Sequence, residues 1–339
     1  MNHSPIKRVV HLTCWLLCLT AALLLLGLYT GSLGLEFNDW QDPILQDIRL
    51  PRTLGAWLAG ALLGLSGALA QGLFRNPLAD PYLLGSASGA TLGVTVALML
   101  GLWGGAHLPS EASMAMQWMW RLGITGCAFL GAWVAVVLTL LLARGVQHTL
   151  RLLLAGVVVG VVLGAITSLL LVAAPQILPA MQAFTLGSTA MLSGASCVLM
   201  AMVLVWCLLF SWRLSPLLDG LSLGEATAQS LGLRVAPLRL LLLAVMALAT
   251  ATAVAQTGLI AFVGLVAPHL VRARVRATFA AFSVMSALMG GVLLCFADIL
   301  ARWISAPQEL PVGVLTAILG GGYLLWRLQS PAMREGDVS

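Results

Sequence analysis

Long apolar runs separated by short polar segments repeat along almost the whole chain. A helix needs roughly 20 mostly apolar residues to cross about 30 Å of hydrocarbon, and the sequence contains ten runs that reach or approach this length. We therefore predict ten transmembrane helices, at residues 9–30, 51–74, 82–104, 118–143, 151–173, 190–212, 237–256, 259–271, 279–301 and 311–328. The eighth is the shortest, and it contains Pro268.

The first apolar run follows Lys7 and Arg8, a feature that secretory signal peptides share. The run is longer than the apolar core of a signal peptide, and no clear small-residue cleavage site follows it. We therefore expect it to remain in the protein as the first span.

The segments between the runs are too short to fold as separate domains. We expect an all-α membrane protein with one domain over residues 1–339, embedded from about 9 to 328 and followed by a short tail at 329–339. The polar stretch 222–233 is bracketed by Gly224 and Gly232, and its Ala, Glu and Gln residues favour a short cytoplasmic helix.

Basic residues are distributed unevenly once the ten spans are threaded alternately through a bilayer. Cytoplasmic segments collect Lys and Arg. With both termini in the cytoplasm, the outer side keeps only Arg49, Arg52, Arg121 and Arg302 of the 17 Lys and Arg. The other 13 lie inside: Lys7, Arg8, Arg75, Arg144, Arg151, Arg213, Arg234, Arg239, Arg272, Arg274, Arg276, Arg327 and Arg334.

Composition agrees with this threading. The chain is 60% hydrophobic and 9% charged, with a mean hydropathy of +1.01, whereas about a quarter of the residues in a soluble domain are charged. The net charge of +5 is explained by orientation and contact with an anionic leaflet, so no nucleic-acid partner is needed. All six cysteines lie in apolar runs without metal-type spacing, and we expect neither disulfides nor a metal site.

Small residues recur every four positions on the second and third spans. In lipid, such rows let two helix backbones approach closely. We therefore expect close helix packing along two rows, formed by Gly60, Gly64 and Ala68 and by Gly85, Gly89 and Gly93.

Several transport and enzyme chemistries find little support in the sequence. Ion-coupled transporters usually bury acidic residues in mid-membrane; here Asp298 and Arg302 lie toward one end of a span, one turn apart, where we expect them to pair. A nucleotide-binding loop needs a Gly-Lys-Ser/Thr sequence, but the only lysine, Lys7, stands in a glycine-free segment. Any ATP hydrolysis must reside in another polypeptide.

One enzymatic alternative is an intramembrane serine protease. Gly64-Leu-Ser66-Gly67 on the second span and His269 on the eighth supply a serine and a histidine. Nucleophilic catalysis would require Ser66 and His269 to lie within hydrogen-bond reach. The competing interpretation is a packing face around Ser66 and an ordinary helix-end position for His269.

Three sequence blocks together resemble a known family. The first runs from Arg49-Leu-Pro-Arg52 through Arg75-Asn-Pro-Leu-Ala-Asp-Pro81 to Gly89-Ala90, the second covers 258–272, and the third joins 297–302 to 309–313. This pattern resembles the FecCD or BtuC-like permeases of type II ABC importers, which take up iron-siderophores, haem and vitamin B12. The resemblance covers about residues 45–326.

The resemblance implies a ten-helix subunit in the cytoplasmic (inner) membrane. It would pair with a second copy of itself, bind two ATPase subunits that hold ATP and Mg²⁺, and receive cargo from a soluble binding protein outside. No cofactor is implied in this chain. The arginines of the family that meet the binding protein correspond to Arg49, Arg52 and Arg302.

The family also implies two further regions. The segment that couples to the ATPase corresponds to 216–232, with Gly224, Glu225, Ala228 and Gly232 on its motif. The cargo path on the dimer axis corresponds to 151–190 and 311–326. Candidate lining residues there are Met181, Gln182, Thr185 and Ser188.

The cargo is the most open part of the resemblance. The form Leu223-Gly-Glu225 looks more like haem and cobalamin permeases than most siderophore permeases, which favours haem, with vitamin B12 and an iron-siderophore as alternatives. The chain departs from the usual family pattern in the loop at 273–279 and at Gly320-Gly-Gly-Tyr323. Gating inferred from relatives is therefore not transferred to this chain.

Overall fold

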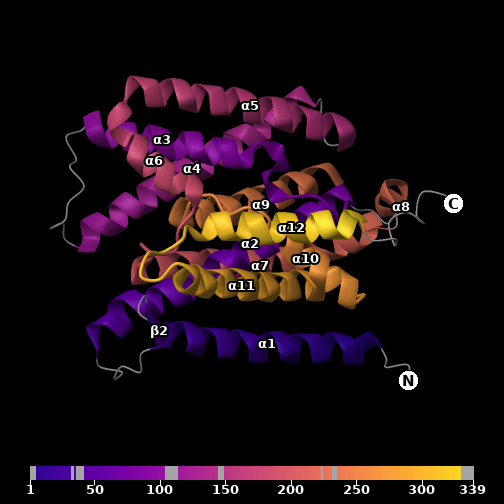
Figure 1. Ribbon diagram of the computed structural model, residues 1–339. Helices are drawn as coiled ribbons and strands as arrows, with labels where there is room; N and C mark the ends of the chain where they lie inside the picture. Colours follow the sequence, from indigo (N-terminus) through magenta and orange to yellow (C-terminus); the bar gives the residue numbers. More distant parts are fainter. Residues whose placement is uncertain are drawn as a thin grey trace.

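The fold is taken from a computed structural model, which describes residues 5–31, 34–35, 42–103, 114–143, 149–222, 224–230 and 235–329. Nearly every described element is helical (Figure 1). The long helices are α1 (Pro5–Tyr29), α2 (Leu50–Phe74), α3 (Ser86–Trp103), α4 (Met114–Leu142), α5 (Thr149–Ala173), α7 (Gly194–Ser222), α9 (Val235–Thr257), α10 (Val263–Arg274), α11 (Phe279–Ile304) and α12 (Val312–Gln329).

Short elements connect these helices. A π-helical turn, η1 (Ile44–Arg49), leads into α2, and two 3₁₀ turns, η2 (Pro81–Leu84) and η3 (Pro175–Ile177), precede α3 and α6. The short helices are α6 (Leu178–Leu186) and α8 (Glu225–Ser230). The strands β1 (Thr30–Gly31) and β2 (Gly34–Leu35) form one small antiparallel ladder, in which Thr30 pairs with Leu35.

The ten long helices coincide with the ten predicted spans, so the all-α membrane fold is confirmed. Seven of the described helices are long and apolar enough to cross a bilayer alone, and Ser86–Leu102 and Val312–Trp326 are shorter apolar helices. The remaining helix of the ten, α10, has only 12 residues and contains Pro268. The N-terminal end of α1, the C-terminal end of α12 and α8 lie at the same end of the bundle (Figure 1), as the predicted threading requires.

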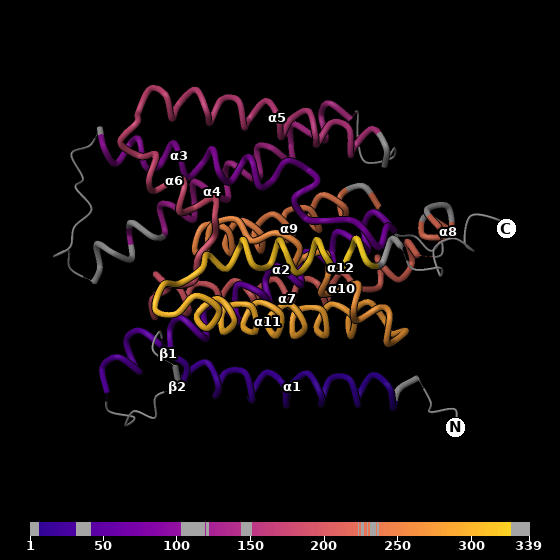
Figure 2. The backbone as a smooth tube through the Cα atoms, in the orientation of Figure 1, coloured from indigo at the N-terminus to yellow at the C-terminus, as the bar shows by residue number. Residues whose placement is uncertain are grey.

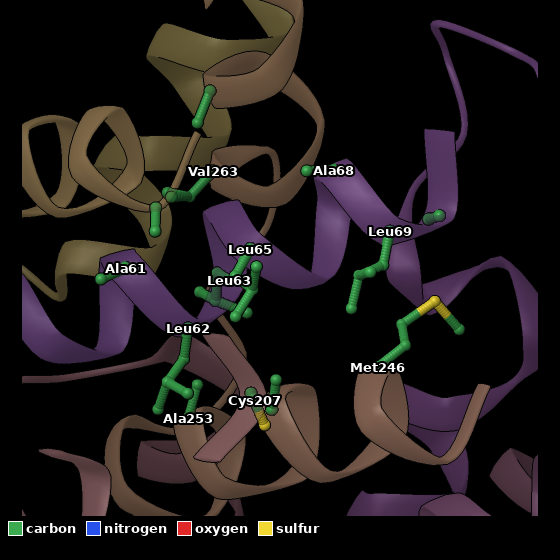
Figure 3. Close-up of a cluster of buried hydrophobic side chains, with 14 of the residues drawn as sticks. Ala61, Leu62, Leu63, Leu65, Ala68, Leu69, Cys207, Met246, Ala253 and Val263 are labelled. Atoms are coloured by element: carbon green, nitrogen blue, oxygen red, sulfur yellow. The ribbon is translucent and has the colours of Figure 1, made fainter. Parts of the chain in front are cut away.

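Helix α2 lies at the centre of the bundle. Within its most apolar stretch 89% of the residues are buried, and α2 packs against α7, α9, α10 and α11. Figure 3 shows part of this core, where Leu62 and Leu65 of α2 lie among Cys207 of α7, Ala253 of α9 and Val263 of α10. Because α2 is apolar on every side, it can be surrounded by other helices.

The predicted small-residue rows bring helix backbones into contact. A Cβ atom added at Gly60 would lie 2.3 Å from the carbonyl oxygen of Gly290 on α11, and one added at Gly64 would lie 2.2 Å from that of Ser286 on the same helix. On α3, a Cβ at Gly89 would meet the carbonyl oxygen of Gly131 on α4 at 2.3 Å. These separations leave no room for a methyl group, so the expected close packing is confirmed.

Candidate functional site

An ion cluster joins five parts of the chain at the outer end of the bundle. The guanidinium of Arg52 on α2 donates from Nε and Nη2 to Oδ1 of Asp298 on α11, each at 3.2 Å. Its Nη1 donates to both carboxylate oxygens of Glu309, at 2.7 and 2.8 Å. Arg302 pairs with Asp298 one turn away, and the hydroxyl of Thr189 donates to Asp298 as well. The predicted Asp298–Arg302 pair is confirmed.

Arg302 also holds the end of α1 in place. Its Nη1 donates to the carbonyl oxygens of Gly27 and Thr30, at 3.0 and 3.1 Å, and its Nη2 donates to Oγ1 of Thr53 at 3.3 Å. The cluster therefore fixes α1, α2, α11, the turn before α7 and the connection to α12 relative to one another.

Burial explains why so many partners are needed. Asp298 is fully buried and Arg302 is 2% exposed. A buried charge is tolerated when it is paired and its remaining hydrogen-bonding positions are filled, and removal of one partner typically costs about 3–5 kcal/mol. Two arginines against Asp298 and Glu309 make the cluster neutral overall, and its main effect is to clamp the outer helix ends together.

Arg302, one of the three predicted docking residues, has its guanidinium enclosed by α1, α2 and α11. Arg49 and Arg52 lie at the same end of the molecule and are each 8% exposed. Docking through Arg49, Arg52 and Arg302 stays a prediction.

The sequence reasoning missed three members of this cluster. It did not predict that Thr189 and Arg52 bond to Asp298, or that Glu309 bonds to Arg52. Most of these partners lie far from one another in the sequence. The sequence did indicate that Asp298 needs several partners, because a buried carboxylate must be paired and hydrogen-bonded. It did not indicate which residues, distant in the chain, provide those partners.

Part of the predicted coupling segment lies within the described residues. Residues 216–222 continue α7, with Pro216 inside the helix, and α8 (Glu225–Ser230) is the described part of the helix predicted over 222–233. Between them Gly224 has a φ of +113°, which residues with a side chain rarely adopt. Ala228 is fully buried. The backbone of Glu225 begins α8, and Gly232 lies outside the described residues.

A cavity at the inner end lies beside this segment. It has a volume of about 420 Å³ and is lined by the end of α2, the end of α7 and the connection between α10 and α11. Asp219 of α7 and Arg276 of the connection both face it, as does Arg75, whose guanidinium donates to the carbonyl oxygen of Leu221 at 3.5 Å. The inner loop that departs from the family pattern therefore contributes to the surface beside the coupling helix.

Three of the four predicted path residues lie together. Met181, Gln182 and Thr185 on α6 line a cavity of about 340 Å³. Its other walls come from α3, from α5 and from Leu259. Helices α3 and α5 contribute four hydroxyl groups to these walls, from Ser88, Thr91, Thr167 and Ser168. No charged residue is among the described residues that line it. Such a wall offers weak polar contacts and little electrostatic attraction.

Ser188 is the exception among the path residues. It is not among the residues lining this cavity. Its backbone N–H donates to the carbonyl oxygen of Thr257 at 2.7 Å, and its hydroxyl oxygen accepts from the N–H of Ala190 at 3.2 Å. Ser188 therefore shapes the turn between α6 and α7, and its expected lining role stays a prediction.

The serine protease alternative gains no support. The buried Ser66 hydroxyl donates its hydrogen to the carbonyl oxygen of Leu63 at 2.8 Å. The ring of His269 lies edge-on to Tyr323 of α12, with 6.0 Å between the ring centroids. The single hydroxyl hydrogen of Ser66 is thus used within its own helix.

Comparison with known proteins agrees with the geometry. The chain matches the FecCD transport family over residues 10–330. The vitamin B12 import system permease protein BtuC of Escherichia coli O157:H7 (strain EC4115 / EHEC) is 37% identical over 322 residues, which cover 93% of this chain and 94% of that protein. BtuC of Shigella boydii serotype 18 (strain CDC 3083-94 / BS512) is 36% identical over the same coverage.

Solved structures show the same arrangement of helices. An inward-facing structure of an ABC transporter of the metal-chelate type superposes with a TM-score of 0.77, at 30% identity, and covers 96% of this chain and 100% of that one. PsaBC from Streptococcus pneumoniae, solved with a Fab, has a TM-score of 0.58 at 17% identity, which supports the fold alone. The chain belongs to the FecCD transport family, and is a multi-pass permease subunit of an ABC importer in the cytoplasmic membrane.

Proposed function

We propose that the cargo of this permease is vitamin B12 or a closely related corrinoid. The observation that carries the proposal is the 37% identity to vitamin B12 permeases over 93% of the chain. The uncharged, hydroxyl-bearing cavity around Gln182 and Thr185 supports it, since a bulky chelate passes more easily along a wall that does not bind it tightly. Haem, which the sequence pattern at 223–225 favoured, is the second candidate.

We further propose that two copies of the chain work with two ATPase subunits and one soluble binding protein. The outward face of α5 supports a second copy, because large apolar side chains there, such as Val161, Leu169 and Val172, are mostly exposed in the single chain. This face adjoins the cavity around Gln182, of which α5 forms one wall. A second copy covering it would enclose the cavity between two chains.

Uptake by the reconstituted complex tests the function. The chain, its ATPase and its binding protein are placed in liposomes with ATP, and entry of cyanocobalamin, haem and a ferric siderophore is measured separately. We expect ATP-dependent uptake of cyanocobalamin, and none with an ATPase that lacks its catalytic glutamate. Uptake that persists with the inactive ATPase, or that follows a proton or sodium gradient without it, would contradict the importer mechanism.

The binding protein gives an independent measure of cargo. Thermal stabilisation of the purified binding protein by each ligand reports its preference without transport, because a ligand that binds only the folded state raises the unfolding temperature. Stabilisation by cyanocobalamin alone is expected. Stabilisation by haem and not by cyanocobalamin would replace the first candidate with the second.

A further inference from the structure

A groove at the inner end of the bundle carries an uncompensated positive charge. It lies between the first turns of α1 and the end of α10 and has a volume of about 680 Å³. Lys7, Arg8 and Arg274 line it together with His11, and none of the described lining residues is acidic. Arg274 makes one long hydrogen bond, 3.5 Å, to the carbonyl oxygen of Leu270 in its own helix. We call this feature the α1 groove.

The α1 groove changes from charged to apolar along its length. Its apolar walls are Leu12 and Trp15, which follow the basic residues along α1, and Val275, which follows Arg274. The Trp15 side chain is about half exposed. Because a helix rises 1.5 Å per residue, Trp15 lies roughly 10–12 Å deeper along α1 than Lys7 and Arg8. Cations at one end and an aromatic wall at the other match a phospholipid, whose phosphate lies above its acyl chains, better than a soluble anion.

The position of α1 favours a lipid over a protein partner. Helix α1 lies at the outer edge of the bundle, on the side away from α5 (Figure 2), and only 17% of its most apolar stretch is buried. Its main neighbour is α11. Helix α8, where we expect the ATPase to bind, is separated from α1 by α10 and α11 in Figure 1. The α1 groove thus faces the surroundings of the bundle, at the end where the cytoplasmic leaflet begins.

We propose that the α1 groove binds one anionic phospholipid of the cytoplasmic leaflet. The phosphate lies against Lys7, Arg8 and Arg274, and an acyl chain follows Leu12 and Trp15 toward the membrane interior. Binding ties the edge helix α1 to the end of α10. The proposal is independent of the cargo and of the docking role of the outer arginines.

Native mass spectrometry of the purified chain in mild detergent tests this. The chain is titrated with dioleoyl phosphatidylglycerol, with neutral dioleoyl phosphatidylcholine, and with sn-glycerol 3-phosphate as a soluble phosphate. The test variant is Lys7→Gln with Arg274→Gln. The control is Arg151→Gln with Arg213→Gln, which removes the same charge from exposed residues on α5 and α7 that do not line the α1 groove.

Wild type and control should each bind one phosphatidylglycerol with similar affinity and prefer it to phosphatidylcholine. The test variant should bind it about 25-fold more weakly, since each basic side chain beside an anionic headgroup contributes roughly fivefold. Lys7→Arg with Arg274→Lys should restore binding. Equal affinity for both lipids, equal loss in test and control variants, or displacement by sn-glycerol 3-phosphate would overturn the proposal. So would a test variant that keeps its lipid but no longer assembles with the ATPase.

Discussion

The carboxylate of Asp219 accepts a hydrogen bond of 2.9 Å from the backbone N–H of Phe279, so the last turn of α7 is tied to the first residue of α11. The first N–H groups of a helix have no partner within it, and Thr278, which precedes α11, makes no side-chain cap. Asp219 therefore supplies the cap from another helix. Because α11 carries Asp298 and Arg302 at its other end, this bond links the coupling segment to the outer ion cluster through one continuous helix.

Loss of this cap should reduce coupling. For Asp219→Ala we expect a cost of about 1 kcal/mol, typical of a lost helix cap, and several-fold less cargo moved per ATP hydrolysed. Asp219→Asn keeps an acceptor oxygen and should behave nearly as wild type. Ser222→Ala is the control, because its hydroxyl bonds within α7, to the carbonyl oxygen of Asp219. Unchanged cargo per ATP in Asp219→Ala would exclude this bond from transmission.

The outer ion cluster predicts a non-additive pair of substitutions. Arg302→Met should destabilise the protein by about 3–5 kcal/mol, because it leaves the buried Asp298 with one fewer cation. Adding Asp298→Leu should recover part of that loss, since Arg52 keeps Glu309 as a partner. Thermal unfolding of both single variants and the double variant in detergent gives the interaction energy. A double variant that loses the sum of the two single losses would contradict the clamp.

Helix packing around α2 predicts a large effect of one methyl group. Gly67→Ala would place its Cβ within 1.6 Å of a backbone oxygen of α10, and backbone atoms cannot move aside as a flexible side chain can. We expect a loss at or above the 1–3 kcal/mol that is usual for an overpacked core. Gly123→Ala on α4 meets nothing within 4 Å and should be neutral or slightly stabilising. Similar unfolding temperatures for both variants would refute the close α2–α10 contact.

Docking of the binding protein can be tested at Arg49, which lies at the outer end of the molecule and is 8% exposed. Reversal of Arg52 would also break its bonds to Asp298 and Glu309, so a loss of docking there would be ambiguous. Arg49→Glu should slow association at low salt by about tenfold, because charges at the rim of an interface act mainly on encounter rate. Surface plasmon resonance with the binding protein measures this, with the unfolding temperature as the folding control. An unchanged association rate at low salt would remove Arg49 from the docking surface.

Ser66→Ala separates transport from the protease alternative. The Ser66 hydroxyl bonds only to the Leu63 carbonyl among the described residues, so its removal should cost no more than about 1 kcal/mol. Uptake by the reconstituted complex should stay within twofold of wild type. Complete loss of function in a normally folded Ser66→Ala variant would revive a catalytic role.

Most of the fold could be predicted from the sequence because a bilayer imposes a simple length rule. Every predicted span has a helix, and even the short eighth is present as α10. The close packing at Gly60 and Gly64 was also predictable, since rows of small residues have few other uses in lipid. Boundaries were less accurate: α7 continues past Pro216 to Ser222, beyond the predicted end of the span at 212.

The candidate site was predictable only in part. Met181, Gln182 and Thr185 do gather at one cavity, since all three lie on α6. Ser188 does not line it, and the positive φ of Gly187 turns the chain away just before it. For Arg302 the sequence indicated only a charge near the end of a span. A charge at that position fits docking of the binding protein and a buried ion pair with Asp298 equally well.

By itself, the sequence determined the membrane class, the number and order of the spans, their orientation and the family. These properties depend on hydrophobic length, on the sidedness of Lys and Arg and on local motifs, all of which can be read along one chain. Only the tertiary structure decided which arginines are buried, that Asp219 caps α11, and that Lys7, Arg8 and Arg274 share one groove. Those facts depend on contacts between distant segments, whose partners are chosen by packing in three dimensions.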